Sequence, residues 1–310
     1  MAALDETIVF FGSGPVAAKS LQLLAQDFRI EAVITKPRAE GHRGSVPVLE
    51  LAERLALPTV VASNKKQLSE HVVAAKFKSQ AGVLVDFGII VEQETIDLFP
   101  LGIVNSHFSL LPQWRGADPI TFSILSGQSK TGVSLMLLVE AMDEGPLLAV
   151  GEMSLDAQAT TPELTDRLID LSDALLKDAL PKYLAGQLVG SSQEKIAATV
   201  GYDATPTYSR KLTKEDGILN WDKPAVQLER EIRAYLGWPK SRCVLGKHAV
   251  IITKAHAEQG EGTPGMLWNQ DKKLGVYTAK GVLMLDDIKP AGKGEMSAAA
   301  FLNGYGRDLG

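Results

Sequence analysis

The central part of the chain reads GIVNSHFSLLPQWRG over residues 102–116. Its short apolar run ends in two polar side chains, Asn105 and His107, and alternate residues of a strand point to the same face. Beyond them, Pro112 lacks a backbone donor and Gly116 permits the dihedral angles of a turn, so the strand is expected to end near His107. The segment therefore predicts an amide and an imidazole side by side at the end of a strand.

A second apolar run, residues 133–139, leads to a loop that carries Asp143. Open α/β sheets collect reactive groups where their strands end, so we expect the three polar side chains to meet. The trio suits acyl transfer without a covalent intermediate, because the Asn105 amide and a protonated His107 can hold an oxyanion. Asp143 can hold the imidazole in its cationic form or accept a proton from an attacking amine. Taken singly, each residue has a plainer interpretation as a cap or turn residue.

The composition is that of a globular protein large enough for two domains. The 310 residues are 45% hydrophobic and 22% charged, with a net charge of −5, which argues against a uniformly basic surface. The single cysteine excludes an internal disulfide, and the five histidines show no metal-ligand spacing, so no metal is expected. We find no signal peptide pattern and no apolar run of the ~18 residues that a membrane span needs, so we expect a cytoplasmic protein with no membrane contact.

Charge is distributed unevenly along the chain. From Thr207 onward there are 16 Lys and Arg against 12 Asp and Glu, whereas the preceding residues carry 16 against 25. A solvated surface explains this difference, and so does a C-terminal part that meets a polyanion. Composition alone leaves both interpretations open.

Apolar runs in the N-terminal part alternate with helical patterns. This alternation predicts an α/β fold, with a Rossmann-like doubly wound parallel sheet. Ser63 is expected to cap one of the helices, and a long amphipathic helix is expected to begin at Thr161. The predicted strands occupy residues 7–11, 30–35, 59–61, 81–85, 102–107 and 133–139.

A glycine-rich turn, Gly12-Ser13-Gly14, follows the first predicted strand. The plainer interpretation is a tight turn from strand to helix. A dinucleotide-binding loop of the Gly-x-Gly-x-x-Gly type would carry its third glycine at Ala17, where alanine is sometimes tolerated. A nicotinamide-dependent oxidoreductase is therefore an alternative enzyme class, and it predicts binding of NADH.

The chain changes character after residue 190. Residues 191–206 contain Ser191, Ser192, Gly201 and Pro206, and they are predicted as a linker between a domain of residues 1–190 and a domain of residues 207–310. The second domain has short apolar runs bounded by Gly, Asp or Asn, which is typical of a small OB-like β-barrel. The runs occupy residues 249–253, 265–268, 275–278 and 282–288.

Residues 105–116 resemble the signature of the 10-formyltetrahydrofolate-dependent formyltransferases, and Asp143 falls where that family places its acid. The resemblance implies that Asn105, His107 and Asp143 are catalytic and that 10-formyltetrahydrofolate is the formyl donor, with no metal. It implies a folate-binding set of Phe87, Gly88, Ile89, Ser109, Leu110, Leu111 and Pro112, in which Phe87 and Ile89 would wall the pterin ring. The chain departs from the family pattern at Asp86, Phe108 and Pro146.

Within the family, the chain is most similar to the members that formylate initiator methionyl-tRNA. Residues 36–45 form a basic loop that, by this resemblance, would enter the tRNA acceptor stem, and a domain of residues 207–310 would bind tRNA. We expect a monomer. The implied tRNA-binding residues are Lys36, Arg38, Arg43, Arg210, Lys211, Lys289 and Lys293. Solvated surface loops are the plainer interpretation of each basic segment.

Two further alternatives concern the acceptor and the activity. The same chemistry could serve a small amine, such as an amino-sugar nucleotide or glycinamide ribonucleotide. A protein that binds tRNA but has lost its activity would bind with salt-sensitive affinity and transfer nothing. The intact trio of Asn105, His107 and Asp143 argues against such a loss.

Overall fold

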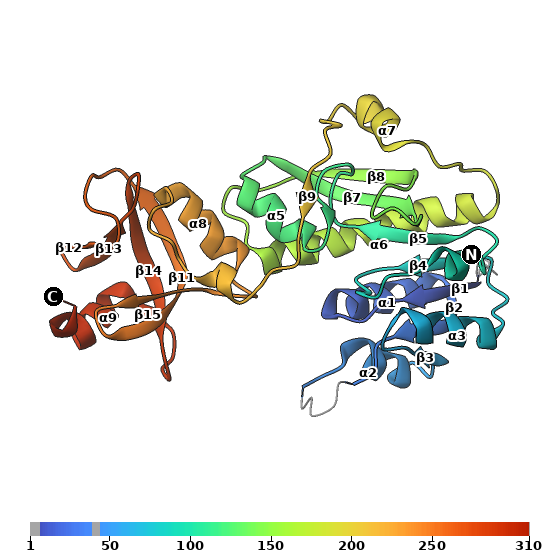
Figure 1. Ribbon diagram of the computed structural model, residues 1–310, viewed down its shortest axis with the longest axis horizontal. Helices are drawn as coiled ribbons and strands as arrows, with labels where there is room; N and C mark the ends of the chain where they lie inside the picture. Colours follow the sequence, from blue (N-terminus) through green and yellow to red (C-terminus); the bar gives the residue numbers. More distant parts are fainter. Residues whose placement is uncertain (1–6, 39–43, 310) are drawn as a thin grey trace. The chain divides into compact units, whose positions relative to one another are not determined.

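The computed structural model describes residues 7–38 and 44–309 of the chain (Figure 1). The chain divides into two compact units. The first unit comprises Met1–Pro119, Lys130–Met153 and Thr165–Ser209, and the second comprises Ile120–Ser129, Ser154–Leu164 and Arg210–Gly310. Among the helices of the described residues, none is long and apolar enough to cross a membrane.

A seven-stranded sheet is the centre of the first unit, with the strand order β3-β2-β1-β4-β5-β7-β8. The five strands from β3 to β5 pair in parallel, as predicted, whereas β7 pairs with β5 in antiparallel orientation. The chain winds outward from β1 to β3 and then crosses to β4, so the topological switch point lies between β1 and β4. The strands are β1 Thr7–Phe11, β2 Arg29–Thr35, β3 Thr59–Val61, β4 Ala81–Leu84, β5 Ile103–His107, β7 Lys130–Leu137 and β8 Leu147–Ser154. The predicted α/β fold is confirmed, and β8 was not predicted.

The helices between these strands begin at residues suited to that position. Helix α1 begins at Pro15, whose fixed φ and missing N–H fit a first turn. Helix α3 is capped by Asn64, which accepts the N–H of Gln67 at 3.1 Å, one residue later than the predicted cap at Ser63. The helices are α1 Pro15–Asp27, α2 Pro47–Arg54, α3 Lys65–Ala75, α4 Gln93–Ile96, α5 Pro119–Ser126, α6 Thr161–Leu184 and α7 Gln193–Val200. Helix α6 begins at Thr161, as predicted.

An aromatic cluster stabilises the core beneath the strand ends. The ring of Phe11, at the end of β1, meets Phe87 edge-on with centroids 5.7 Å apart, and it meets Phe99 at 5.8 Å. Such edge-to-face pairs contribute about 0.5–1.5 kcal/mol beyond their buried area. The chain that leaves β4 is therefore fixed in the core at Phe87.

The segment predicted as a linker contains folded structure. Ser192 caps helix α7, and Ser191 forms a β-bridge with Leu147 of β8. The hydroxyl group of Tyr202 donates to the carbonyl oxygen of Leu111 at 2.8 Å. A two-stranded parallel ladder joins β6 Arg115–Gly116 to β9 Tyr208–Ser209. Residues 191–206 thus pack on the first unit.

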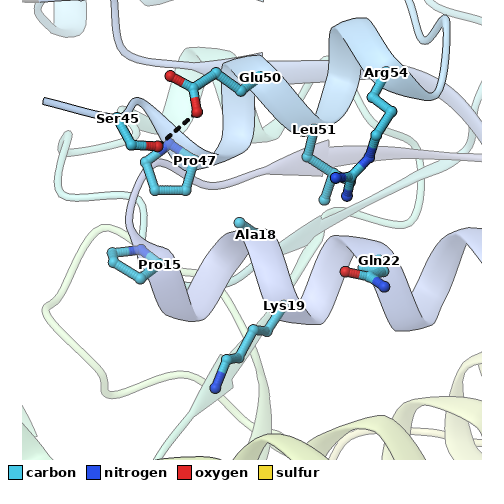
Figure 2. A pocket seen from close by; sticks show the side chains of 9 residues that line it. All are labelled: Pro15, Ala18, Lys19, Gln22, Ser45, Pro47, Glu50, Leu51 and Arg54. Atoms are coloured by element: carbon cyan, nitrogen blue, oxygen red, sulfur yellow. Dashed lines mark hydrogen bonds between the residues drawn. The ribbon is translucent and has the colours of Figure 1, made fainter.

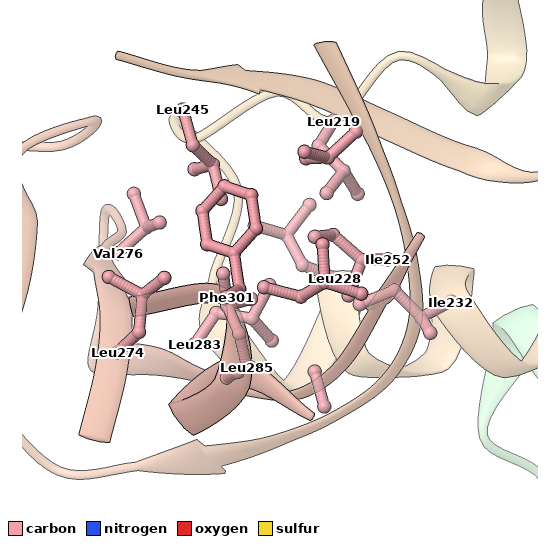
Figure 3. Close-up of a cluster of buried hydrophobic side chains, with 14 of the residues drawn as sticks. Leu219, Leu228, Ile232, Leu245, Ile252, Leu274, Val276, Leu283, Leu285 and Phe301 are labelled. Carbon is pink, nitrogen blue, oxygen red and sulfur yellow. The ribbon is translucent and has the colours of Figure 1, made fainter. Parts of the chain in front are cut away.

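The second unit is built around an antiparallel sheet with the order β10-β11-β14-β13-β12, and β15 pairs with β14. Figure 3 shows its core, in which Leu228 and Ile232 of α8 and Phe301 of α9 pack against strand residues. The predicted C-terminal OB-like β domain is confirmed, although β10, β15 and α9 were not predicted. The elements are η1 Glu215–Gly217, α8 Ala225–Ala234, β10 Ser241–Leu245, β11 His248–Glu258, β12 Leu267–Gln270, β13 Lys273–Tyr277, β14 Val282–Pro290, β15 Met296–Ser297, α9 Ala298–Tyr305 and η2 Gly306–Asp308.

Candidate active site

Strand β5 places Asn105 and His107 on one face, as the period of two predicts. On the other face, the hydroxyl group of Ser106 bonds that of Ser172 in α6 at 2.6 Å. Asn105 is 8% exposed and His107 is 6% exposed. No hydrogen bond joins the Asn105 side-chain amide to any residue that the structure describes. The fully enclosed, unpartnered polar side-chain atoms of the described residues do not include those of Asn105, so its amide keeps access to solvent and is available to bind a reactant.

The imidazole of His107 is oriented by the loop that follows β5. Its Nε2 lies 2.9 Å from the carbonyl oxygen of Trp114, and because a carbonyl can only accept, Nε2 carries a proton. Nδ1 lies 3.8 Å from Oδ2 of Asp143. That distance is too long for a hydrogen bond but short enough for the carboxylate to stabilise an imidazolium ion. Nδ1 is thus the ring atom left to meet a reactant.

Asp143 is held by a backbone donor and by an unusual backbone conformation. Its Oδ2 accepts the N–H of Gly116 at 2.7 Å, and its φ of +52° lies in the left-handed region. Trp114 and Asp118 also have positive φ angles, of +58° and +57°. Non-glycine residues adopt this region rarely, and such residues cluster at functional sites. The structure therefore brings together the three residues that we predicted as catalytic.

Gln193 anchors the loop that carries Asp143, and sequence reasoning missed it. It is 2% exposed, and its Nε2 donates to the carbonyl oxygens of Asp143 at 2.7 Å and Gly145 at 3.0 Å. Its Oε1 accepts from Nη2 of Arg115 at 2.8 Å, and Nη1 of Arg115 donates to Glu144 at 2.9 Å. Local sequence does not indicate this role, because a glutamine that follows a glycine and two serines has no mark of burial.

The residues predicted as the folate-binding signature are buried and shape the turn after β5. Ser109 donates its hydroxyl proton to the carbonyl oxygen of Gln113 at 2.5 Å. Ser134 of β7 donates to the carbonyl oxygen of Ser109 at 2.8 Å and accepts the N–H of Leu111 at 3.0 Å. Leu110, Leu111 and Pro112 are buried as well. The Ser109 hydroxyl group is thus engaged within the protein, and a role of these residues in folate binding stays a prediction.

The segment after β4 is anchored through its carbonyl groups. Ser13 donates its N–H to the carbonyl oxygen of Asp86 at 3.0 Å and its hydroxyl proton to that of Phe87 at 2.6 Å. Lys36 donates to the carbonyl oxygen of Gly88 at 2.7 Å. The Phe87 side chain lies in the core, so it cannot wall a ligand, whereas Ile89 is half-buried. Phe87 can therefore offer a ligand only its backbone.

Asp86 occupies the place where a dinucleotide-binding loop would receive a phosphate. A Cβ atom built on Gly14 would lie 2.0 Å from Oδ2 of Asp86, so the carboxyl group is packed on the N-terminus of α1. Desolvation by surrounding protein atoms, together with the nearby Asp118, raises the pKa of Asp86 to about 6, and Lys36 opposes the shift. One side of the residue stays exposed. A carboxylate in this position repels a pyrophosphate and argues against the nicotinamide-dependent alternative.

Comparison with known proteins gives the same family as the resemblance. A model of the formyl transferase family matches residues 7–180, and a model of the formyl transferase C-terminal domain matches residues 211–306. The chain belongs to the formyl transferase family. It is 32% identical over 306 residues to methionyl-tRNA formyltransferase of Roseiflexus castenholzii, covering 96% of this chain and 95% of that protein. It is 34% identical over 303 residues to methionyl-tRNA formyltransferase of Myxococcus xanthus, with 96% and 95% covered.

A solved structure supports the fold of this formyl transferase. The N-formyltransferase from Helicobacter canadensis, in complex with folinic acid and dTDP-3-aminofucose, superposes with a TM-score of 0.67 at 16% identity. The match covers 90% of this chain and 98% of that chain. The similarity therefore extends over the fold of both domains, and at this identity it shows the fold alone.

Among the basic residues that we predicted to bind tRNA, two arginines of this formyl transferase, Arg38 and Arg210, are held by protein groups. Arg38 donates to the carbonyl oxygen of Gly44 at 2.9 Å and to Glu50 at 3.2 Å. In the second unit, Arg210 donates to Oδ2 of Asp216 at 2.8 Å and forms a two-fold pair with that carboxylate. Arg43 lies outside the described residues.

Three of the predicted tRNA-binding lysines are exposed. The ammonium groups of Lys211, Lys289 and Lys293 form no ion pair or hydrogen bond with a described residue of the second unit. Their ammonium groups are therefore available to phosphate groups, whereas the paired arginines would first have to leave their acids.

A shallow groove between α1 and α2 is separate from this chemistry (Figure 2). It has a volume of about 300 Å³, and Lys19, Glu50 and Arg54 are among its lining residues. Glu50 accepts a hydrogen bond from Ser45 at 2.6 Å. The groove contains no pairing of an acid with an imidazole, so we place the active site at the end of β5. Across residues 7–38 and 44–309 there is no group of three or more His, Cys, Asp or Glu side chains that could hold a metal.

Proposed function

We propose that this formyl transferase moves the formyl group of 10-formyltetrahydrofolate to the α-amine of initiator methionyl-tRNA. The proposal rests on one observation above all, the buried and unpartnered Asn105 amide beside a His107 that faces Asp143. The relatives that match nearly the full chain at 32–34% identity carry the name methionyl-tRNA formyltransferase. The site supports acyl transfer, and the relatives support the choice of acceptor.

The reaction needs donors for an oxyanion more than it needs a nucleophile on the protein. The α-amine attacks the formyl carbon, and the formyl oxygen gains negative charge as the new C–N bond forms. An N–H of Asn105 and the Nδ1–H of protonated His107 donate to that oxygen. Collapse of the intermediate breaks the bond between the formyl carbon and N10 of the folate, and N10 takes a proton. An α-amine has a pKa of about 7.7–8.0, so a useful fraction is already neutral at pH 7.

Asp143 faces the ring atom of His107 that would meet the reactant. Because Nε2 is anchored on Trp114, the second proton of an imidazolium ion lies on Nδ1, which faces the Asp143 carboxylate across 3.8 Å. The Asp143 carboxylate can receive the proton that the amine loses. The carboxylate itself is fixed by Gly116.

We assign the segment from Phe87 to Ile89 to the pterin ring of the folate. Its carbonyl oxygens are engaged by Ser13 and Lys36, whereas no described residue accepts the N–H groups of Gly88 and Ile89. The segment can therefore offer backbone donors to the polar edge of a flat ring, and Ile89 can cover its face. Ser109 to Pro112 would support this site by fixing the turn that follows β5.

Residues 207–310 are proposed as the tRNA-binding domain and residues 1–190 as the folate-binding catalytic domain. The C-terminal excess of 16 basic over 12 acidic residues and the exposed Lys211, Lys289 and Lys293 support this division. Neutralisation of phosphates by lysines releases counterions, so tRNA binding should weaken steeply with salt.

The decisive experiment mixes the protein with 10-formyltetrahydrofolate and charged initiator methionyl-tRNA, and it measures formyl-methionine after deacylation. An elongator methionyl-tRNA is the matched control. Formylation of the initiator alone is the expected result. If neither tRNA is formylated while folate still binds, the proposed acceptor is wrong, and a small amine such as an amino-sugar nucleotide takes its place in the assay.

A further inference from the structure

Lys36 connects two loops of the first unit that lie far apart in the sequence. It follows directly on β2, and its half-buried side chain reaches the carbonyl oxygen of Gly88, 2.7 Å from Nζ. Strands β2 and β4 both pair with β1 and lie on either side of it. The lysine therefore crosses the end of β1, at the switch point of the sheet, to reach the segment after β4.

The contact between Lys36 and Gly88 is close as well as polar. Gly88 has a φ of +64°, and a Cβ atom built on it would lie 2.8 Å from Nζ of Lys36. The ammonium group thus lies directly against the backbone of the segment. Ser13 engages the carbonyl oxygens of Asp86 and Phe87. Three consecutive carbonyl groups are fixed in this way, and only the last of them depends on a side chain from outside the Gly12–Gly14 turn.

The positive charge of Lys36 also acts on the nearby acidic residues. Asp86 and Asp118 repel each other, and Lys36 is the cation that acts against this repulsion at Asp86. The ammonium group donates a charge-assisted hydrogen bond to the carbonyl oxygen of Gly88 and attracts the Asp86 carboxylate through its charge. The other side chain at this end of β1, Ser13, is neutral and cannot replace that charge.

We propose that Lys36 is a positioning residue for the donor-binding segment Asp86–Ile89, and that it does not contact the tRNA. This inference rests on the proposed function, in which that segment binds the pterin ring. It replaces the interpretation of Lys36 as part of a basic loop that reaches nucleic acid. Lys36 acts through Gly88, because its ammonium group is already engaged before any ligand arrives.

The test compares Lys36→Met with Lys36→Arg and with Lys289→Met, an exposed lysine of the second unit. For each variant, binding of tetrahydrofolate is measured without tRNA, and binding of initiator tRNA is measured without folate at several salt concentrations. Loss of a hydrogen bond from a charged donor should weaken folate binding by Lys36→Met about tenfold. The tRNA affinity and its salt dependence should stay as in the wild type. Lys36→Arg should restore most of the folate affinity.

Lys289→Met should show the opposite pattern, with unchanged folate binding and a salt slope for tRNA that is smaller by about 0.7–0.9. If Lys36→Met behaves like Lys289→Met, Lys36 contacts a phosphate and the proposal is wrong. If the variant keeps full folate affinity and full tRNA affinity, the link to Gly88 has no function and the proposal is also wrong. A wild-type protein that binds no tetrahydrofolate would instead overturn the proposed function.

Discussion

Replacing Gln193 by methionine tests whether the loop of Asp143 is held in place from α7. Methionine has nearly the same volume, so the change removes hydrogen bonds without opening a cavity. Lost are the two bonds from Nε2 to the carbonyl oxygens of Asp143 and Gly145, at 2.7 and 3.0 Å. The bonds from Nη2 and Nε of Arg115 to Oε1, at 2.8 and 3.3 Å, are lost as well. Gln193 is 2% exposed, so its side of these hydrogen bonds is buried.

The expected loss of stability is worked from the three shortest of these bonds, at 2.7, 2.8 and 3.0 Å. A neutral bond contributes about 1 kcal/mol and a bond to a charged group about 1.5–3 kcal/mol, so we expect a total near 4 kcal/mol. For a unit of this size, each kcal/mol lowers the melting temperature by roughly 2–4 °C, which predicts a fall of at least about 8 °C. Displacement of Asp143 by about 1 Å should also lower kcat about 100-fold, because catalysis depends on orientation.

Thermal unfolding followed by circular dichroism measures the first effect, and single-turnover formyl transfer measures the second. The matched control is Gln187→Met, because Gln187 is exposed and a surface substitution usually changes stability by less than about 0.5 kcal/mol. The reasoning is refuted if Gln193→Met melts within about 2 °C of the control and turns over at the wild-type rate.

Three further predictions concern single side chains. Asn105→Ala should lower kcat by about 10²–10³ while tetrahydrofolate binding, measured by fluorescence, stays unchanged, because the amide acts only on the oxyanion. Asp86→Asn should raise the melting temperature at pH 8 and have little effect near pH ~3. The pKa of Asp86 is raised to about 6, so the ionised carboxylate destabilises the folded protein above that pH, whereas below the unfolded pKa the residue at position 86 is neutral in both proteins and in both states. Arg210→Met should lower the melting temperature at pH 7, and the difference should shrink below pH ~4, because Arg210 holds the pKa of Asp216 well below its usual range and the stabilisation is lost as that carboxylate is protonated.

The sequence was most informative where a local period decides the structure. Alternation along a strand is enough to place Asn105 and His107 on one face, and the end of the next apolar run is enough to bring Asp143 near them. The direction of β7 could not be derived in the same way, because a buried strand has the same composition in parallel and antiparallel pairing. The predicted cap of α3, Ser63, was wrong by one residue. Ser and Asn cap helices about equally well, so the sequence does not distinguish Ser63 from Asn64.

Contacts between polar residues far apart in the chain have no such period, and they account for what the sequence missed. Gln193 reaches a loop 50 residues earlier, and Lys36 reaches a glycine 52 residues later. Neither residue differs, in its local sequence, from a solvated one. A buried polar side chain is recognised only when its partners are known, because burial is favourable only when each donor and acceptor is satisfied.

The basic residues show why charge in a sequence is weaker grounds for nucleic-acid binding than exposed charge in a structure. Arg38 and Arg210 were both predicted to bind tRNA, yet each is paired with an acid a few residues away, Glu50 and Asp216. The planar guanidinium group suits a carboxylate as well as a phosphate, so an arginine near an acid in the chain is often satisfied before RNA arrives. The exposed lysines have no such acid among the described residues, so they, rather than the arginines, should carry the salt dependence of tRNA binding.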